Sequence, residues 1–200
     1  PSFTAVNEVS PMFDWTCTDI GNALGLIDHQ DGFGVTAATA GDSLAVYFAK
    51  KVSAGTRATG ASHIKFSSQY CFAYLEEIDA TIGQDATARF RCDTAYDGTN
   101  IPLIVTTRAT LPSSINPLTS KFKLGKVLIN AANVPGVVGL SYRTGIEVGV
   151  AFAGDDYRPT FLSVTKIAPE ITIRCQAVPA YSTYYGAGAY AVPGSGICTI

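Results

Sequence analysis

The chain has 200 residues, of which 47% are hydrophobic and only 15% charged, and its formal net charge is −2. A chain of this length can bury roughly 70% of its unfolded surface without disulfides or metals. The charge balance, with no basic run longer than Lys50-Lys51, argues against a protein that grips nucleic acid by neutralising phosphates. No apolar run approaches the roughly 18 residues of a membrane span, so we expect a soluble protein without a membrane partner.

Charge is divided unevenly along the chain. Residues 1–100 hold twelve acidic and six basic residues, a net charge of −6, whereas residues 101–200 hold four acidic and eight basic residues, a net charge of +4. Opposite charges at two ends of a subunit favour head-to-tail stacking of copies. Pairing of these acids and bases inside the fold is an equally good interpretation.

The N-terminal segment PSFTAVNEVSPMFDWTC, residues 1–17, has a counterpart in PTFLSVTKIAPEITIRC, residues 159–175. Two prolines, a phenylalanine, a valine and the final cysteine recur in step. Proline cannot donate to a strand ladder, so each copy is predicted to form a strand, a corner at Pro11 or Pro169, and a second strand. We expect two related β-units in one domain, and a chain that begins at Pro1 after methionine removal rather than one that lacks an N-terminal block.

One helix is predicted in IGNALGLIDHQ, residues 20–30. Its apolar residues recur at helical spacing, Asp19 or Thr18 can cap it, and Gly32 follows it. The next region, residues 32–62, is rich in small residues and contains one short strand signal, from Ser43 to Phe48. A connection of this length is usually functional or contacts a partner, so we treat it as an extended loop.

Alternating apolar and polar residues predict antiparallel strands in the middle of the chain. The apolar residues of ATARFRCDTAY, residues 86–96, share one side of a strand, and the turn IGQDA joins this strand to another from Tyr70 to Ile82. PLIVTTRATL, residues 102–111, adds a strand before the LPSSINP loop.

The second half is predicted to continue the sheet, first from Phe122 to Ile129 and then through VGLSYRTGIEVGVAF, residues 138–152. One side of this second stretch is apolar and is predicted to be buried: Val138, Leu140, Tyr142, Ile146, Val148, Val150 and Phe152. Glycines on the other side permit bulges, bends or close approach of another backbone. Residues 1–178 are thus expected to form one domain, and the irregular residues 179–200 a C-terminal arm that packs on a neighbour or frays.

The five cysteines are odd in number and widely spaced: Cys17, Cys71, Cys92, Cys175 and Cys198. Four of them lie in strand-like contexts, where a thiol packs as a small apolar side chain. The pattern predicts reduced, structural cysteines in a reducing compartment.

Patterns that indicate catalysis or cofactor binding are weak. The chain has only two histidines, His29 and His63, and no G-x-S-x-G elbow. The DHQDG segment, residues 28–32, lacks the order of a calcium loop and the distant ligands that zinc needs. The fragment from Gly186 to Gly188 is not followed by the helix of a nucleotide loop. We therefore expect no enzyme activity, no metal and no cofactor.

Glu76, Glu77 and Asp79 form the densest acidic cluster of the chain, on or beside a strand. Paired carboxylates for glycoside chemistry need two supporting walls and a defined separation, which one strand does not provide. We interpret the cluster as a negatively charged surface, and ordinary solubility explains it almost as well.

The order of these features resembles that of the tail-tube (major tail) proteins of long-tailed bacteriophages and prophages, over positions 1 to about 178. VNEVSPMFDWTCTDIGNALG is similar to the family's pattern of a proline, a strand and a helix. VYFAKKVSAGTRATGASHIKFS resembles its strand with a basic, glycine-rich loop, and ATARFRCDTAYDGTNIPL resembles its strand and turn. The segment from FKLGKVLIN to EITIRC, residues 122–175, is similar to its last three-strand block.

The resemblance implies a mainly β fold, an antiparallel β-sandwich or barrel with one α-helix, and a structural virion protein. Copies would form rings, expected to be hexameric, that stack into a tail tube for DNA passage. Tape-measure and other tail proteins are the implied partners, genomic DNA would transit without specific binding, and the tail would be assembled in the host cytoplasm. Glu76, Glu77 and Asp79 are the expected channel-facing acids, and Lys50, Lys51 and Arg57 the expected assembly-loop residues.

A second class of protein fits the same composition. This is a β-sandwich binding or decoration module of a virion or cell surface, attached to carbohydrate or to a capsid. A tail terminator or a head decoration protein relies on the same β-sheet physics. A monomer with an aromatic-lined groove would favour this class, whereas rings would favour the tube.

Overall fold

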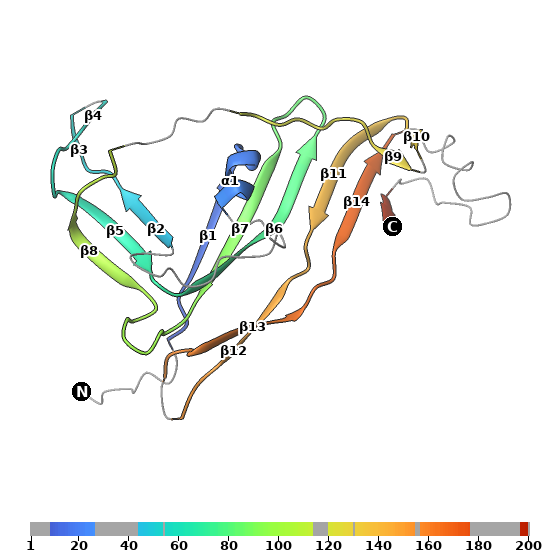
Figure 1. Cartoon of the computed structure of the whole chain (residues 1–200). Coiled ribbons are helices and arrows are strands. Elements are labelled where there is room, and N and C mark those ends of the chain that lie inside the picture. Colours follow the sequence, from blue (N-terminus) through green and yellow to red (C-terminus); the bar gives the residue numbers. More distant parts are fainter. Residues whose placement is uncertain are drawn as a thin grey trace, which may run out of the picture.

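The computed structural model describes residues 9–26, 44–53, 55–113, 120–129, 131–154, 157–176 and 197–199. The fold is mainly β and sandwich-like, with antiparallel sheets and one short helix, as the sequence predicts (Figure 1). The large sheet has six strands in the order β1-β7-β6-β11-β14-β15, and a second sheet has three in the order β2-β5-β8.

The strands of the large sheet are β1 (Met12–Cys17), β6 (Cys71–Thr81), β7 (Thr87–Thr94), β11 (Val137–Arg143), β14 (Glu170–Cys175) and β15 (Ile197–Thr199). Those of the second sheet are β2 (Leu44–Phe48), β5 (His63–Ser68) and β8 (Ile104–Ala109). Three two-stranded ribbons complete the described strands: β3 (Lys51–Ser53) with β4 (Thr56–Arg57), β9 (Leu128–Ile129) with β10 (Ala132–Asn133), and β12 (Glu147–Ala151) with β13 (Phe161–Lys166).

The helix α1 (Ile20–Leu26) lies where the sequence predicts a helix, directly after β1. The Asp19 carboxylate accepts hydrogen bonds from the backbone N of Asn22 at 3.5 Å and from its Nδ2 at 2.8 Å. These bonds satisfy a donor that the first turn leaves unpaired. Ile20 and Ala23 are buried against the large sheet.

Phe90 lies at the centre of the main core and is 0% exposed. Its ring stacks on Trp15 with the centroids 5.3 Å apart. The other buried members come from α1, β6, β7 and the turn before β7: Ile20, Ala23, Leu75, Ala80, Ala86 and Ala88. The predicted apolar side of residues 86–96 therefore forms the core, and the predicted β6–β7 hairpin is confirmed.

A second cluster joins the two sheets. Leu44 of β2 packs against Cys71, Ala73 and Cys92, which lie on the same side of the large sheet as Phe90 because β6 and β7 pair Ala73 with Cys92 and Leu75 with Phe90. The end of the three-stranded sheet that contains Leu44 thus packs as a second layer over the core side of the large sheet. Figure 1 shows the two sheets joined at the β5–β6 connection, with α1 beside β1, β7 and β6.

The cysteines pack as the sequence predicts. Cys71 and Cys92 are buried in the core, and Cys17 and Cys175 are half-buried at the ends of β1 and β14. These four side chains are free thiols. Each therefore acts as a small apolar group in the packing.

The stretch 138–152, predicted to continue the sheet with one buried face and with glycines that permit a bend, is interrupted at one of those glycines. The chain forms β11 and β12, which are separated by a bend at Thr144 and Gly145. Gly145 has φ 59°, and a Cβ on it would lie 2.0 Å from the carbonyl oxygen of Ala168. The bend directs β12 and β13 away from the large sheet (Figure 1), so the predicted buried face ends there and Val150 and Phe152 are exposed.

The strand predicted from Phe122 to Ile129 is also largely wrong, because only Leu128 and Ile129 form a strand. The preceding residues cross the end of the β6–β7 hairpin. The carbonyl of Phe122 accepts a hydrogen bond from the backbone N of Ala86 at 2.7 Å, and Lys123 forms an isolated bridge with Asp85. Leu124 packs on the core, which explains the apolar alternation without a strand.

Of the predicted repeat, the strand that follows the proline is present in both copies. Both β1 and β14 begin one residue after the paired prolines, Pro11 and Pro169, and both are six-residue strands that end in a cysteine. Pro169 lies in the break between β13 and β14, as a corner requires. The first strand of the N-terminal copy falls in residues 1–8, outside the described residues.

The extended loop expected at 32–62 contains more strand than the sequence indicated. Its predicted strand is confirmed as β2, but β3 and β4 form a further small ribbon that the pattern did not reveal. In the C-terminal region expected as an arm, the described residues 197–199 form β15, which pairs with β14.

Candidate functional site on the charged face of the large sheet

The side of the large sheet that faces away from the core carries most of its charged residues. In the β6–β7 register Leu75 pairs with Phe90 on the core side, and the next pair, Glu77 with Arg89, lies on the other side. A β-bulge at Glu76 places one extra residue of β6 between these two pairs. We call this side the charged face, and its ionisable residues are Asp14, Glu76, Glu77, Asp79, Arg89, Arg91, Asp93, Arg143, Glu170 and Arg174.

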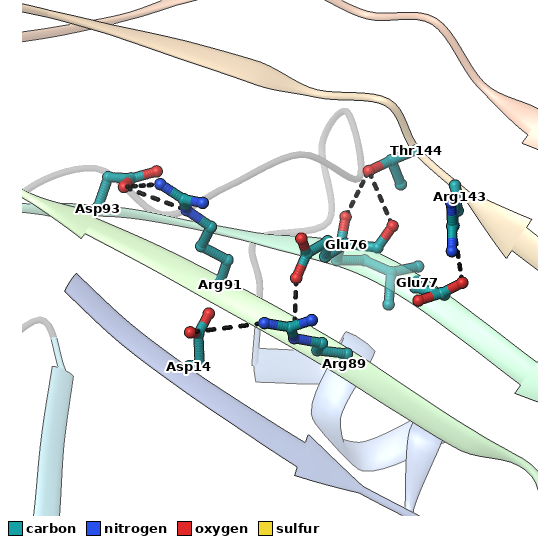
Figure 2. Close-up of polar contacts among 9 residues, drawn as sticks. Asp14, Glu76, Glu77, Arg89, Arg91, Asp93, Arg143 and Thr144 are labelled. Atoms are coloured by element: carbon teal, nitrogen blue, oxygen red, sulfur yellow. Dashed lines mark hydrogen bonds and ion pairs between the residues drawn. The ribbon is translucent and has the colours of Figure 1, made fainter.

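Arg89 lies between two carboxylates from neighbouring strands (Figure 2). Its Nε is 3.0 Å from Oε2 of Glu76, and its Nη2 is 3.7 Å from Oδ2 of Asp14. Half of the Arg89 side chain remains exposed, so each pair contributes only a small amount to stability. The main consequence is that the guanidinium is held by protein carboxylates.

Glu77 is held more firmly. Its Oε1 accepts a hydrogen bond from Nε of Arg143 at 2.8 Å (Figure 2). It also accepts one from the Ser141 hydroxyl at 3.0 Å. The Arg143 guanidinium lowers the pKa of the Glu77 carboxyl below its ordinary value, partial burial opposes this shift, and the Ser141 hydroxyl adds to it. The carboxylate therefore stays ionised well into the acidic range.

Asp93 and Tyr74 form the buried end of the charged face. Asp93 is 8% exposed and accepts from Nη2 of Arg91 at 3.1 Å (Figure 2), and Tyr74 is 3% exposed. Burial, the largest cause, and the charges of Asp93 and Glu76 together raise the pKa of the Tyr74 hydroxyl to about 12, while Arg91 opposes them. Tyr74 is thus held neutral over the physiological range.

This shift predicts a loss of stability at alkaline pH. The folded-state pKa of Tyr74 lies about two units above the ordinary tyrosine value of about 10. Its contribution is therefore complete below pH 10 and is lost between about pH 10 and pH 12, by about 2 kcal/mol. Urea unfolding at pH 8 and pH 11.5 should show a larger decrease for the natural protein than for Tyr74→Phe, since the variant has no hydroxyl to ionise. Equal decreases would contradict the assigned shift.

A shallow hollow of about 430 Å³ lies over β6, β11 and β14. It is lined by Glu77, Asp79, Ser141, Arg143, Glu170, Thr172 and Arg174. The guanidinium of Arg174 lies over Gly139, where a Cβ would be only 2.8 Å from its Nε. Among the described residues no group of His, Cys, Asp or Glu is arranged to hold a metal ion.

The three acids predicted to face a channel do lie together on the charged face, but the surface is not purely acidic. Arg89 and Arg143 pair with Glu76 and Glu77. Across the described strands, six carboxylates and four guanidinium groups give this face a net charge of −2. Single-sequence reasoning missed Arg143 because β11 is distant from β6 in the chain, and it missed Arg89 because the bulge at Glu76 shifts the register of the β6–β7 hairpin.

The other candidate residues, Lys50, Lys51 and Arg57, lie at the β3–β4 ribbon at a separate corner of the molecule (Figure 1). The base of this ribbon is held by the backbone of Lys50, whose N donates to Nδ1 of buried His63 at 3.0 Å and whose carbonyl accepts from the N of Ala58 at 2.8 Å. None of the described carboxylates pairs with the three cations.

The uneven division of charge along the chain is partly explained by internal pairing. Glu77 pairs with Arg143, and Asp85 pairs with Lys121 at 2.7 Å. Each pair joins an acid of the first half to a base of the second. These pairs favour the internal-pairing interpretation over a separation of charge between two ends.

His29 and the rest of the DHQDG segment lie outside the described residues. In the part of the chain that is described, no helix has the length and hydropathy needed to span a membrane. No known family model matches this sequence, and no curated protein is significantly similar to it.

Proposed function

We propose that this chain is a structural virion protein that self-assembles into stacked rings and forms a phage tail tube for DNA passage. The charged face is the observation that carries this proposal. A sheet face with a net charge of −2 weakly repels phosphates. Three of its four arginines, Arg89, Arg91 and Arg143, are engaged by carboxylates, and so they compete poorly for a passing DNA backbone.

The exposure of large apolar side chains supports the self-assembly part of the proposal. Large apolar side chains on the three-stranded sheet and on the β3–β4 and β12–β13 ribbons remain open to solvent in the single chain: Phe48 is 57%, Val52 64% and Phe161 60% exposed. Extended exposed apolar surface is typical of a protein that buries it against partners. The expected hexameric rings and the tape-measure partner follow from the family resemblance and are part of the same proposal.

The basic ribbon provides a direct test of assembly. Deleting most of the 32–62 loop would not test it, because that loop contains β2, whose Leu44 packs on the core. Replacing residues 51–57 with two glycines removes only β3 and β4, since Lys50 and Ala58 already meet through a 2.8 Å hydrogen bond. We expect a folded subunit that no longer forms tubes.

The matched control for the deletion is Lys51→Ala with Arg57→Ala, which keeps the ribbon and removes two cations. Thermal unfolding followed by circular dichroism reports the fold, and negative-stain images report assembly. Tubes of normal length from the deletion variant would show that the ribbon has no role in assembly. If the control variant assembles better than the deletion variant, the shape of the β3–β4 ribbon contributes to assembly beyond the charge of Lys51 and Arg57.

The alternative, a binding or decoration module, would use the hollow on the charged face as its binding site. Its described lining is polar and charged, with no aromatic side chain among the residues that line it. Carbohydrate sites usually present apolar or aromatic surface beside polar groups. The tail-tube proposal accounts for the exposed apolar strands as well, so we favour it.

A further inference from the structure

The β12–β13 ribbon exposes an apolar face. Its register pairs Val148 with Val164 and Val150 with Leu162, so these side chains share one side, and Phe152, the residue directly after β12, follows Val150 at the same spacing of two. We call these five residues the ribbon face. Val150, Phe152 and Val164 are 39%, 38% and 40% exposed. The sequence pattern predicts burial here, yet the single chain leaves the face only partly covered.

The three-stranded sheet exposes a second apolar face. Its register pairs Phe48 with Ile64, Val46 with Phe66, and Phe66 with Val105, which places these side chains on one side. We call these five residues the sheet face. Phe48 contacts Phe66 edge to face at 5.4 Å, but Phe48, Ile64 and Val105 remain 57%, 41% and 51% exposed. Leu44, on the same side of β2, already packs on the core.

We infer that the ribbon face of one copy docks onto the sheet face of a second copy of this chain. This inference rests on the proposed self-assembly and identifies one of its contacts. The two faces lie on different elements, so the contact is heterologous: one copy uses its ribbon face and the other its sheet face, and the pair keeps one free face of each kind. A heterologous contact produces a ring when the rotation closes and a filament when it does not.

The size and charge of the two faces fit a second copy as the occupant. A fully exposed aromatic side chain offers about 150–250 Å², so the two faces together expose on the order of 500 Å² of apolar surface. This is about a third of the roughly 1,600 Å² that a standard interface buries. The two faces could therefore form the apolar centre of such an interface, with polar residues around it. The ribbon is neutral because Lys166 pairs with Glu147 at 2.7 Å, so the cations beside Phe48 do not repel it.

Complementation between two variants tests this contact. Val150→Asp places a charge on the ribbon face, and Phe48→Asp places one on the sheet face. Each variant alone should remain monomeric by light scattering at low protein concentration, before rings stack, because every ribbon-to-sheet contact needs both faces. An equimolar mixture should form a dimer of twice the monomer mass, since the first variant keeps its sheet face and the second keeps its ribbon face.

Control variants carry the same charge on the opposite sides. Ser163→Asp lies on the other side of the ribbon, and Thr106→Asp lies on the other side of the three-stranded sheet. Both should assemble as the natural protein does. If the natural protein is itself monomeric, the proposed function fails. If it assembles and Val150→Asp also assembles, only the docking inference fails. A mixture that stays monomeric would overturn the heterologous arrangement.

A crosslinking experiment keeps the test valid if a charged variant does not fold. Phe152→p-benzoylphenylalanine preserves an aromatic ring at an exposed position. Assemblies made from ¹⁴N- and ¹⁵N-labelled chains are irradiated and analysed by mass spectrometry. We expect adducts between differently labelled chains that join Phe152 to peptides from 44–48, 63–68 or 104–109. Adducts confined to one chain, or to other peptides, would contradict the inference.

Discussion

Replacing Phe90 with alanine is expected to lower the free energy of unfolding by about 3–5 kcal/mol. The ring is fully buried, stacks on Trp15, and is surrounded by small alanines from β6, β7 and the turn between them that cannot move in to fill a cavity. This loss is a large part of the 5–15 kcal/mol that stabilises an ordinary domain. Urea unfolding followed by Trp15 fluorescence measures it, because Trp15 is the only tryptophan of the chain.

Phe48→Ala is the matched control for this prediction. The same atoms are removed, but Phe48 is 57% exposed and packs mainly on Phe66. We expect a loss of about 1 kcal/mol or less in the monomer. A loss as large as that of Phe90→Ala would show that Phe48, rather than the β6–β7 face, lies in the folded core.

Replacing Gly145 with alanine is expected to cost about 3 kcal/mol or more, because two effects combine. A non-glycine residue at φ 59° is strained by about 1–2 kcal/mol. In addition, the new Cβ would lie 2.0 Å from the Ala168 carbonyl oxygen, so the strands must separate and the 3.2 Å hydrogen bond from Ala168 N to the Gly145 carbonyl is lost. Chemical denaturation measures the sum of the two effects.

Gly154→Ala separates the two effects. Gly154 also has φ 59°, but nothing lies within 4 Å of the position of its Cβ. It therefore reports backbone strain alone, and we expect a loss of about 1–2 kcal/mol. Equal losses at the two glycines would mean that the close approach of β11–β12 to Ala168 does not exist in solution.

Strands with one polar side are predicted well from the sequence. In β7 the core residues and the exposed arginines alternate with period two, and a short turn fixes the register with β6. The helix is predicted equally well from the sequence, because Asp19 and the spacing of Ile20 and Ala23 are local signals. In each case the information lies within a few neighbouring residues.

Features that depend on distant residues were not predictable in the same way. The bend at Gly145 depends on Ala168, and the bulge at Glu76 shifts which acids face the arginines. The acidic cluster therefore looked unpaired in the sequence, although Arg143 lies beside Glu77 in space. Alternation in residues 146–152 indicates an apolar face correctly, but it does not say whether the cover comes from the same chain or from another copy.

The molar mass and shape of the purified 200-residue chain test the central claim most directly. Light scattering after size exclusion, combined with negative-stain imaging of the same fractions, measures both across a range of protein concentrations. The proposal predicts rings several times the 21.0 kDa chain mass and, at higher concentration, tubes built from them. A single species of one chain mass at every concentration, with no rings in the images, would contradict it.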